Sequence, residues 1–153
     1  MEFTHILAPT DMSEASLPAI EAAVAIAQRF EAKITLLHVV IAAASKENVD
    51  WKDATKMWLG LADWEEIQDE KQALEAIADK KVPDCLESRV HVLYGDAADE
   101  IASVVKQTGV DLIVMGTHGR TGWRRVVHGS VTEQVLRASV CPVLCIPRLD
   151  AGK

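Results

Sequence analysis

Short apolar runs alternate with amphipathic segments along most of this sequence, and this alternation constrains the fold more than any other feature. Strands that are nearly continuous apolar runs are typical of a parallel sheet covered on both faces, because each strand is then buried on both sides. The pattern therefore predicts a single doubly wound α/β domain, a five-stranded parallel sheet with helices on both faces. The expected strands are residues 5–8, 33–40, 89–94, 111–115 and 142–146.

The segments between these runs carry apolar residues at helical spacing. One stripe begins at Leu17, and because Pro18 is tolerated only in a first turn, this helix is predicted to begin close to Ser16. Another helix is expected to open at Asp96 and to close at Gly109, a residue suited to the left-handed position after a helix. Further helices are expected over residues 63–80 and 130–138.

Length and charge limit the function classes. The chain has 153 residues, 49% of them apolar, which suits one domain with a single substantial core, residues 1–153. The net charge of −7 argues against a nucleic-acid partner, since such domains usually carry a basic face. The first residues lack the pattern of a signal peptide, and no apolar run approaches the roughly 20 residues that span a bilayer. We therefore expect a soluble, cytoplasmic protein without a membrane partner.

The three cysteines form no obvious disulfide framework. Cys141 and Cys145 lie four residues apart in a predicted strand, roughly 13 Å at about 3.3 Å per residue. A disulfide needs Cα atoms closer than about 7 Å, so these two cannot pair within the chain. With Cys85, they are interpreted as buried thiols in a reducing compartment.

Residues 41–87 interrupt the regular alternation. This variable segment holds an insert followed by the second crossover helix, and it contains Trp51, Trp58 and Trp64. The tryptophans either pack on the surface of the domain, or form a flap over a ligand or a docking surface for a partner. The sequence does not decide between these alternatives.

Residues 116–133, GTHGRTGWRRVVHGSVTE, are rich in glycine and cationic side chains although the protein is acidic. In open α/β sheets, ligands bind beyond the carboxyl ends of the strands at the point where the winding reverses, and this stretch follows the fourth strand. Glycines permit close backbone approach, and the first amides of a helix attract anions, so the stretch suits phosphate. A bland alternative is a glycine turn followed by a capping box from Ser130 to Glu133.

The pattern Gly116-x2-Gly119-x9-Gly129-Ser130 resembles the nucleotide-binding signature of the ATP-binding branch of the universal stress protein family. The resemblance extends through ILAPTDMSEAS, LLHVV, VDLIVMGTHGRTG and GSVTEQVLRASVCPVLCIPR, which together cover nearly the whole chain. The glycine pattern differs from that of a Walker loop, because no G-K-[ST] follows the glycines.

The resemblance implies a site for ATP or another adenine nucleotide. Adenine would be held by the backbone of Val39 beside Pro9 and Thr10, and Asp11 would lie near the ribose and phosphates, where it could bind Mg²⁺. The ribose would be lined by Met115 and Gly116. The phosphates would be held by Gly119, Gly129, Ser130, Val131 and Thr132, with His118 and Arg120 in the variable interior of the motif. The family also implies a homodimer through the last strand, Val143 to Pro147.

Three functions are compatible with these residues. The first is an ATP-binding stress or signalling protein whose state depends on nucleotide occupancy. The second is a slow ATPase or nucleotide hydrolase, although no general base is evident and no catalytic residue is assigned. The third is a docking scaffold that binds no nucleotide and uses residues 41–64. The histidines within strands, His5, His38 and His91, are interpreted as packed residues rather than ligands.

Overall fold

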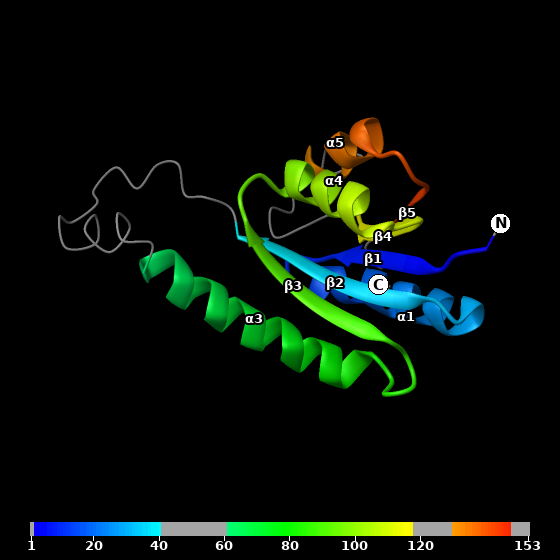
Figure 1. Cartoon of the computed structure of the whole chain (residues 1–153), viewed down its shortest axis with the longest axis horizontal. Helices are drawn as coiled ribbons and strands as arrows, with labels where there is room; N and C mark the ends of the chain where they lie inside the picture. The colour runs from blue at the N-terminus through cyan, green and yellow to red at the C-terminus, as the bar shows by residue number, and fades with distance from the viewer. Residues whose placement is uncertain (1, 41–60, 118–129, 148–153) are drawn as a thin grey trace, which may run out of the picture.

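The computed structural model describes residues 2–40, 61–117 and 130–147, and for residues 61–64 and 130 only the helical backbone. These residues form a five-stranded parallel sheet with helices on both faces, which confirms the predicted fold class (Figure 1). That residues 1–153 make up a single domain stays a prediction, because residues 1, 41–60, 118–129 and 148–153 lie outside the described residues.

The observed strands and α-helices lie within two residues of the bounds that were predicted, whereas the single turn η1 was not predicted. The strands are β1 (His5–Pro9), β2 (Lys33–Val40), β3 (Ser88–Tyr94), β4 (Leu112–Gly116) and β5 (Val143–Ile146). The helices are the short 3-10 helix η1 (Glu14–Ser16) and the α-helices α1 (Leu17–Phe30), α3 (Leu61–Lys81), α4 (Ala97–Thr108) and α5 (Ser130–Ala138).

The order of the strands is β3-β2-β1-β4-β5, with every neighbouring pair parallel. The chain winds outward from β1 to β3 in one direction and then returns to build β4 and β5 on the other side of β1. The winding therefore reverses between β1 and β4, and the carboxyl ends of these two strands form the switch point of the sheet.

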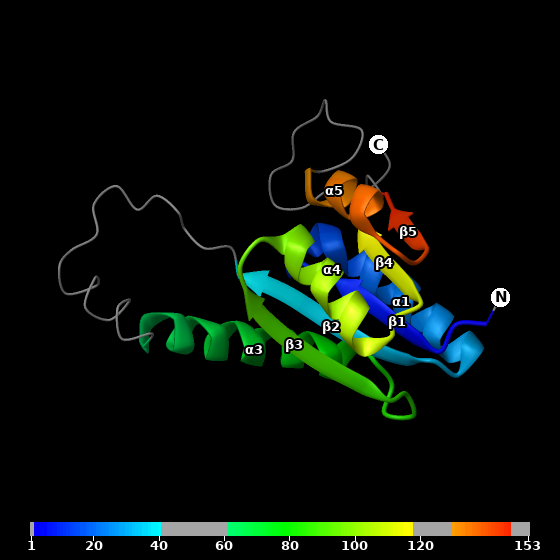
Figure 2. The ribbon, with the colours of Figure 1, turned by 45° about the horizontal axis from the view of Figure 1, so that its top comes forward.

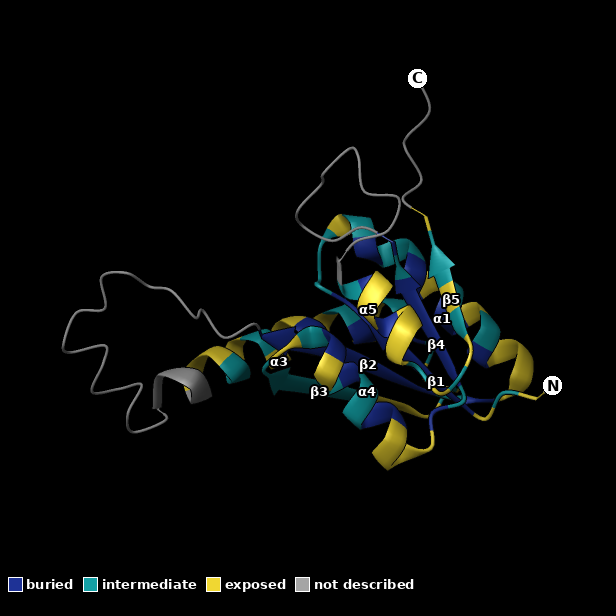
Figure 3. Ribbon diagram, turned by 90° about the horizontal axis from the view of Figure 1, so that it is seen from above, coloured by how far each residue is buried: buried dark blue, intermediate teal, exposed yellow. Residues whose placement is uncertain are grey.

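Within the described ranges, two α-helices cover each face of the sheet: α1 and α3 lie on one side, α4 and α5 on the other (Figures 1 and 3). The period-2 alternation of strands divides the core between these faces. Ile6 and Leu36 contribute to the cluster under α1 and α3, whereas their neighbours Leu7 and Leu37 contribute to the cluster under α4 and α5. All four side chains are fully buried, so the strands form a rigid platform between the two helical layers.

The ends of α4 follow from local chemistry. The Asp96 carboxylate accepts hydrogen bonds from the backbone N–H groups of Ala98 and Asp99, which have no partner within the helix. Gly109 ends the helix with φ +69°, a left-handed conformation that glycine adopts without a Cβ penalty. Both predicted helix signals are confirmed.

The long helix α3 provides the second crossover, as predicted. Leu74 and Ala78 are buried against the sheet, while most of the remaining described helix faces solvent. Trp51, Trp58 and the side chain of Trp64 lie outside the described residues, so the alternatives for residues 41–64 stay open. None of the helices in the described ranges is long and apolar enough to cross a membrane.

The thiols differ from the sequence-based prediction. All three cysteines are free, but Cys85 is exposed and Cys141 and Cys145 are only half-buried. The prediction of three buried thiols was wrong because Cys85 lies in the surface turn between α3 and β3, and because β5 is an edge strand of the sheet. Burial is nevertheless sufficient to raise the pKa of the Cys145 thiol.

Candidate functional site

The carboxyl ends of β1 and β4 lie side by side at the switch point (Figure 2). The register pairs Ile6 with Leu112 and Leu7 with Ile113, so the residues that follow each strand emerge at the same edge. This edge therefore brings together the segment after β1, which begins at Thr10, and the end of β4 at Gly116. These are the segments that the sequence analysis assigns to one site.

Thr10 is held firmly at this edge. Its N–H donates to the Leu37 carbonyl at 2.9 Å and so extends the β1–β2 pairing by one residue. Its side-chain Oγ1 lies 2.8 Å from Ser16 Oγ and accepts from the Met12 N–H at 2.9 Å. With 8% of its surface exposed, Thr10 is a buried anchor for the chain that leaves β1.

Asp11 forms a tight local turn. Its Oδ1 accepts from the Ser13 N–H at 3.0 Å and from Ser13 Oγ at 2.6 Å. Asp11 does not occupy the cap position of the following helix: η1 begins at Glu14, and its cap position is taken by Ser13 without a side-chain bond. The intervening Met12 adopts a left-handed φ of +60°, which a non-glycine residue rarely adopts, and this turns the chain before the helix begins.

The start of α5 is tied to the end of β4. Thr132 is 3% exposed, and its hydroxyl donates to the Gly116 carbonyl at 3.0 Å. A hydroxyl has a single hydrogen, so Thr132 cannot donate to a phosphate while this bond persists. The structure therefore gives Thr132 the role of an anchor that holds the first turn of α5 at the switch point.

The other described candidate residues also lie at this edge of the sheet, and the side chains of three of them pack into the core. Val39 and Met115 are buried, and with the half-buried Val131 they pack into the cluster under α4 and α5. Their side chains thus belong to the core, and any contact with a ligand would be made through the backbone, as the resemblance implies for Val39. Pro9 is the last residue of β1 and pairs with Leu37.

Four candidates lie outside the described residues: His118, Gly119, Arg120 and Gly129. Ser130 is the first residue of α5, but only its backbone is described. The capping box and the phosphate contacts assigned to these residues stay predictions.

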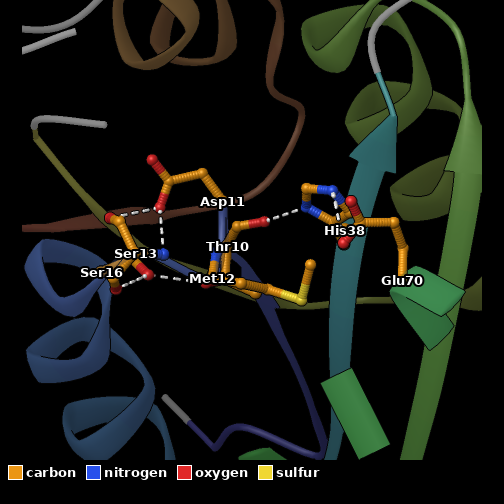
Figure 4. Close-up of polar contacts among 7 residues, drawn as sticks. All are labelled: Thr10, Asp11, Met12, Ser13, Ser16, His38 and Glu70. Atoms are coloured by element: carbon orange, nitrogen blue, oxygen red, sulfur yellow. Dashed lines mark hydrogen bonds and ion pairs between the residues drawn. The ribbon is translucent and has the colours of Figure 1, made fainter. Parts of the chain in front are cut away.

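The sequence analysis missed the partners of Thr10. His38 of β2 is buried, and its Nδ1 lies 2.8 Å from the Thr10 carbonyl, while its Nε2 lies 4.0 Å from Glu70 Oε2 of α3 (Figure 4). The segment LLHVV contained a signal from which this contact could have been predicted. A polar ring within a strand that is buried on both faces needs a hydrogen-bonding partner, and the position of His38 near the carboxyl end placed that partner close to the switch point.

The opposite, amino edge of the sheet carries its own polar network. Burial lowers the pKa of His5 from 6.5, helped by the positive charges of Lys33 and Arg89 and opposed by the hydrogen bond to the Thr108 carbonyl. Burial would raise the pKa of Asp111, but hydrogen bonds from Thr4 and His5 outweigh it and hold this pKa below 3.8. These groups lie away from the candidate site and stabilise the fold.

The family to which this arrangement belongs follows from comparison with known proteins. The model of the universal stress protein family matches residues 2–147. The chain belongs to this family. Universal stress protein MJ0531 of Methanocaldococcus jannaschii is 33% identical over 156 residues, which cover 95% of this chain and 83% of that protein.

Solved structures of universal stress proteins have the same fold. The structure of MJ0577, also from Methanocaldococcus jannaschii, aligns with a TM-score of 0.78 at 28% identity and covers 99% of this chain and 100% of that one. Universal stress protein UspA from Lactobacillus plantarum aligns with a TM-score of 0.74 at 31% identity, over 95% of this chain and 99% of its own.

Two more distant structures of this family contain adenine nucleotides. One is a universal stress protein in complex with cAMP, with a TM-score of 0.62 at 21% identity over 97% of this chain. The other, from Archaeoglobus fulgidus, is in complex with dAMP and aligns with a TM-score of 0.57 at 18% identity over 95% of this chain. At these identities the likeness shows the fold alone, and the ligands are those of the two proteins named.

Proposed function

We propose that this universal stress protein binds an adenine nucleotide, ATP in the first instance, at the switch point between β1 and β4. The observation that carries the proposal is the contact of Thr132 with Gly116, which holds the first turn of α5 against the end of β4. The nucleotide complexes of two relatives with this fold support the ligand class.

The phosphates are assigned to the start of α5. The first four N–H groups of a helix have no partner within it, and the helix dipole favours negative charge there. Ser130 and Val131 supply amides in this turn. Since the Thr132 hydroxyl is occupied by Gly116, we assign phosphate binding chiefly to backbone amides, including those of the glycine-rich segment that precedes the helix.

The residues after β1 suit the remaining parts of the ligand. Asp11 offers carboxylate oxygen, the ligand type that Mg²⁺ prefers, and Mg²⁺ in nucleotide sites usually takes one or two carboxylates together with phosphate oxygens and water. When bound, the ion would neutralise phosphate charge beside this acidic group. Adenine is assigned to the backbone of Val39 next to Pro9 and Thr10.

The proposed biological role is a cytoplasmic stress-response or signalling module whose state depends on nucleotide occupancy. Its free thiols are consistent with a reducing compartment. The binding test is direct: freshly purified protein is denatured, released nucleotide is identified by chromatography, and the stripped protein is titrated with Mg-ATP by calorimetry. Co-purified adenine nucleotide or micromolar binding supports the proposal, and absence of both across a range of temperatures contradicts it.

A substitution of Thr132, which holds the start of α5, tests where the nucleotide binds. Thr132→Val removes the bond to Gly116 and should weaken Mg-ATP binding about fivefold, because a typical hydrogen bond contributes about 1 kcal/mol. Thr108→Val is the matched control, since the Thr108 hydroxyl likewise donates to a carbonyl, that of Val104, but at the amino edge of the sheet. Equal affinities for the two variants would place the nucleotide elsewhere.

We also propose a homodimer through the last strand, Val143 to Pro147. Among the described strands, β5 pairs only with β4, so it leaves an open sheet edge, and Leu144 and the preceding Val140 are exposed. Leu144→Lys should shift the protein towards a monomer in light scattering, whereas Leu136→Lys, which alters a slightly more exposed leucine on α5, should not. A wild-type monomer at micromolar concentration would contradict this assembly.

A further inference from the structure

His38 occupies a polar position in an otherwise apolar face. On β2, Ile34 and Leu36 point into the cluster under α1 and α3, and His38 is the next residue on the same face. On α3, Leu74 contributes to that cluster, and Glu70 lies one turn before it. The pair of His38 and Glu70 therefore closes this half of the core at the carboxyl edge, where the candidate site lies.

The hydrogen bond of His38 fixes one peptide group. Its Nδ1 lies 2.8 Å from the Thr10 carbonyl oxygen. A carbonyl oxygen only accepts, so Nδ1 carries the hydrogen and the ring donates. Because a peptide unit is planar, fixing the carbonyl of Thr10 also fixes the direction of the Asp11 N–H and the path by which Asp11 leaves β1.

The other bonds in this segment are mostly local, and they depend on where Thr10 lies. The Met12 N–H donates to Thr10 Oγ1, and the Ser13 N–H donates to Asp11 Oδ1 (Figure 4). Met12 has a left-handed backbone, which costs energy for a side chain with a Cβ and persists only where surrounding contacts hold it. His38 supplies such a contact from the neighbouring strand, 28 residues along the chain.

We propose that His38 is a positioning residue of the nucleotide site, which orders residues 10–13 by holding the Thr10–Asp11 peptide. The inference rests on the proposed function, because it assigns Asp11 to the ligand. His38 itself contacts Thr10 rather than the nucleotide. Glu70 of α3 lies on the outer side of the ring, where its Oε2 is 4.0 Å from Nε2.

Two substitutions of nearly equal shape separate the hydrogen bond from packing. His38→Leu removes the donor and leaves the Thr10 carbonyl without it. His38→Asn places an amide N–H near the position of Nδ1, so it can still donate to Thr10. If His38 positions residues 10–13, the leucine variant loses their protection from exchange and part of the affinity for Mg-ATP. The asparagine variant then recovers most of both.

Amide hydrogen exchange tests the inference in the protein without nucleotide. The N–H groups of Met12 and Ser13 report on residues 10–13, while those of Leu36 and Ile113 report on the core. In His38→Leu the exchange of Met12 and Ser13 should accelerate roughly tenfold more than that of the core amides, and His38→Asn should reverse this. Acceleration of all four amides to the same extent would show a general packing role and overturn the inference.

Calorimetry with Mg-ATP completes the test. His38→Leu should weaken binding about fivefold to tenfold, consistent with loss of one buried hydrogen bond. In an Asp11→Ala background the same substitution should have little further effect, because residues that act through one another are not additive. Additive losses would overturn the inference. Wild-type protein that binds no adenine nucleotide would overturn the proposed function, and with it the role of His38 in binding, whatever the exchange data show.

Discussion

The two edges of the sheet each contain a buried histidine, and the two rings are held differently. At the amino edge, His5 Nδ1 lies 3.1 Å from the Thr108 carbonyl and Nε2 lies 2.8 Å from Thr35 Oγ1. At the carboxyl edge, His38 Nδ1 lies 2.8 Å from the Thr10 carbonyl, but Nε2 faces the Glu70 carboxylate at 4.0 Å. His5 is thus fully bonded by neutral groups, whereas the outer side of His38 faces a charge.

The elements that each ring joins also differ. His5 ties together β1, β2 and the end of α4, all regular elements. His38 ties β2 to the irregular turn after β1, which contains the left-handed Met12. Both rings thus contact a backbone carbonyl through Nδ1. At the amino edge this contact joins elements of the fold, and at the carboxyl edge it reaches a segment of the candidate site. Substitutions should therefore separate global stability from nucleotide affinity.

The largest expected effect on stability comes from His5. His5→Leu leaves the buried Thr35 hydroxyl and the Thr108 carbonyl without this partner, and it should lower the free energy of unfolding by about 2 kcal/mol or more. Urea denaturation measures the loss. In the fraction that remains folded, the affinity for Mg-ATP should stay within about twofold of wild type. A loss of affinity matching that of His38→Leu would remove the contrast between the edges.

Acidification should lower the free energy of unfolding in two steps, both of which come from groups at the amino edge. The pKa of His5 is lowered from 6.5, so the unfolded state binds this proton more readily and stability should fall as the pH falls below about 6.5. The pKa of Asp111 lies below 3.8, so the stability it contributes is present above that pH and is lost as the pH falls through its folded-state value.

Chemical denaturation across this pH range measures both steps. His5→Leu should remove the upper step, and Asp111→Asn should remove the lower one while leaving the upper one in place. Stability that is independent of pH between 5 and 7 in the wild-type protein would contradict the assignment to His5.

The smallest expected effect concerns the outer partner of His38. Glu70→Gln replaces the carboxylate with an amide that can donate to Nε2, so the carboxyl edge comes to resemble the neutral arrangement around His5. The Glu70 side chain is 30% exposed, so the free energy of unfolding should change by no more than about 0.5 kcal/mol at pH 8. A loss above about 1 kcal/mol would show that the charge itself holds α3 on the sheet.

The sequence predicted the order and type of the described strands and α-helices because apolar residues recur at the matching spacing, although only weakly in α3. The caps of α4 were also predictable, since Asp96 and Gly109 act on their immediate neighbours. The turn after Asp11 was not, because a methionine in the left-handed region runs against the local preference of that residue. The contact that reaches this segment from the neighbouring strand, between His38 and the Thr10 carbonyl, spans 28 residues of sequence.

The candidate site shows the same division. The predicted doubly wound topology indicated which strand ends meet, and the structure brings Thr10 and Asp11 to the same edge as Gly116. The roles of His38 and Glu70 depend on contacts across 28 and 32 residues of sequence, which spacing within a motif cannot express. The buried position of Thr132, and hence its role as an anchor, depends likewise on the packing of α5.

The exposed Cys85 has a practical consequence. It lies in the turn before β3, which is at the amino edge of the sheet, whereas the other two thiols are half-buried near β5. A thiol-reactive fluorophore should therefore label Cys85 first and leave the carboxyl edge chemically unaltered. The chain thus carries a natural attachment point for a spectroscopic reporter at the end of the sheet opposite the proposed ligand.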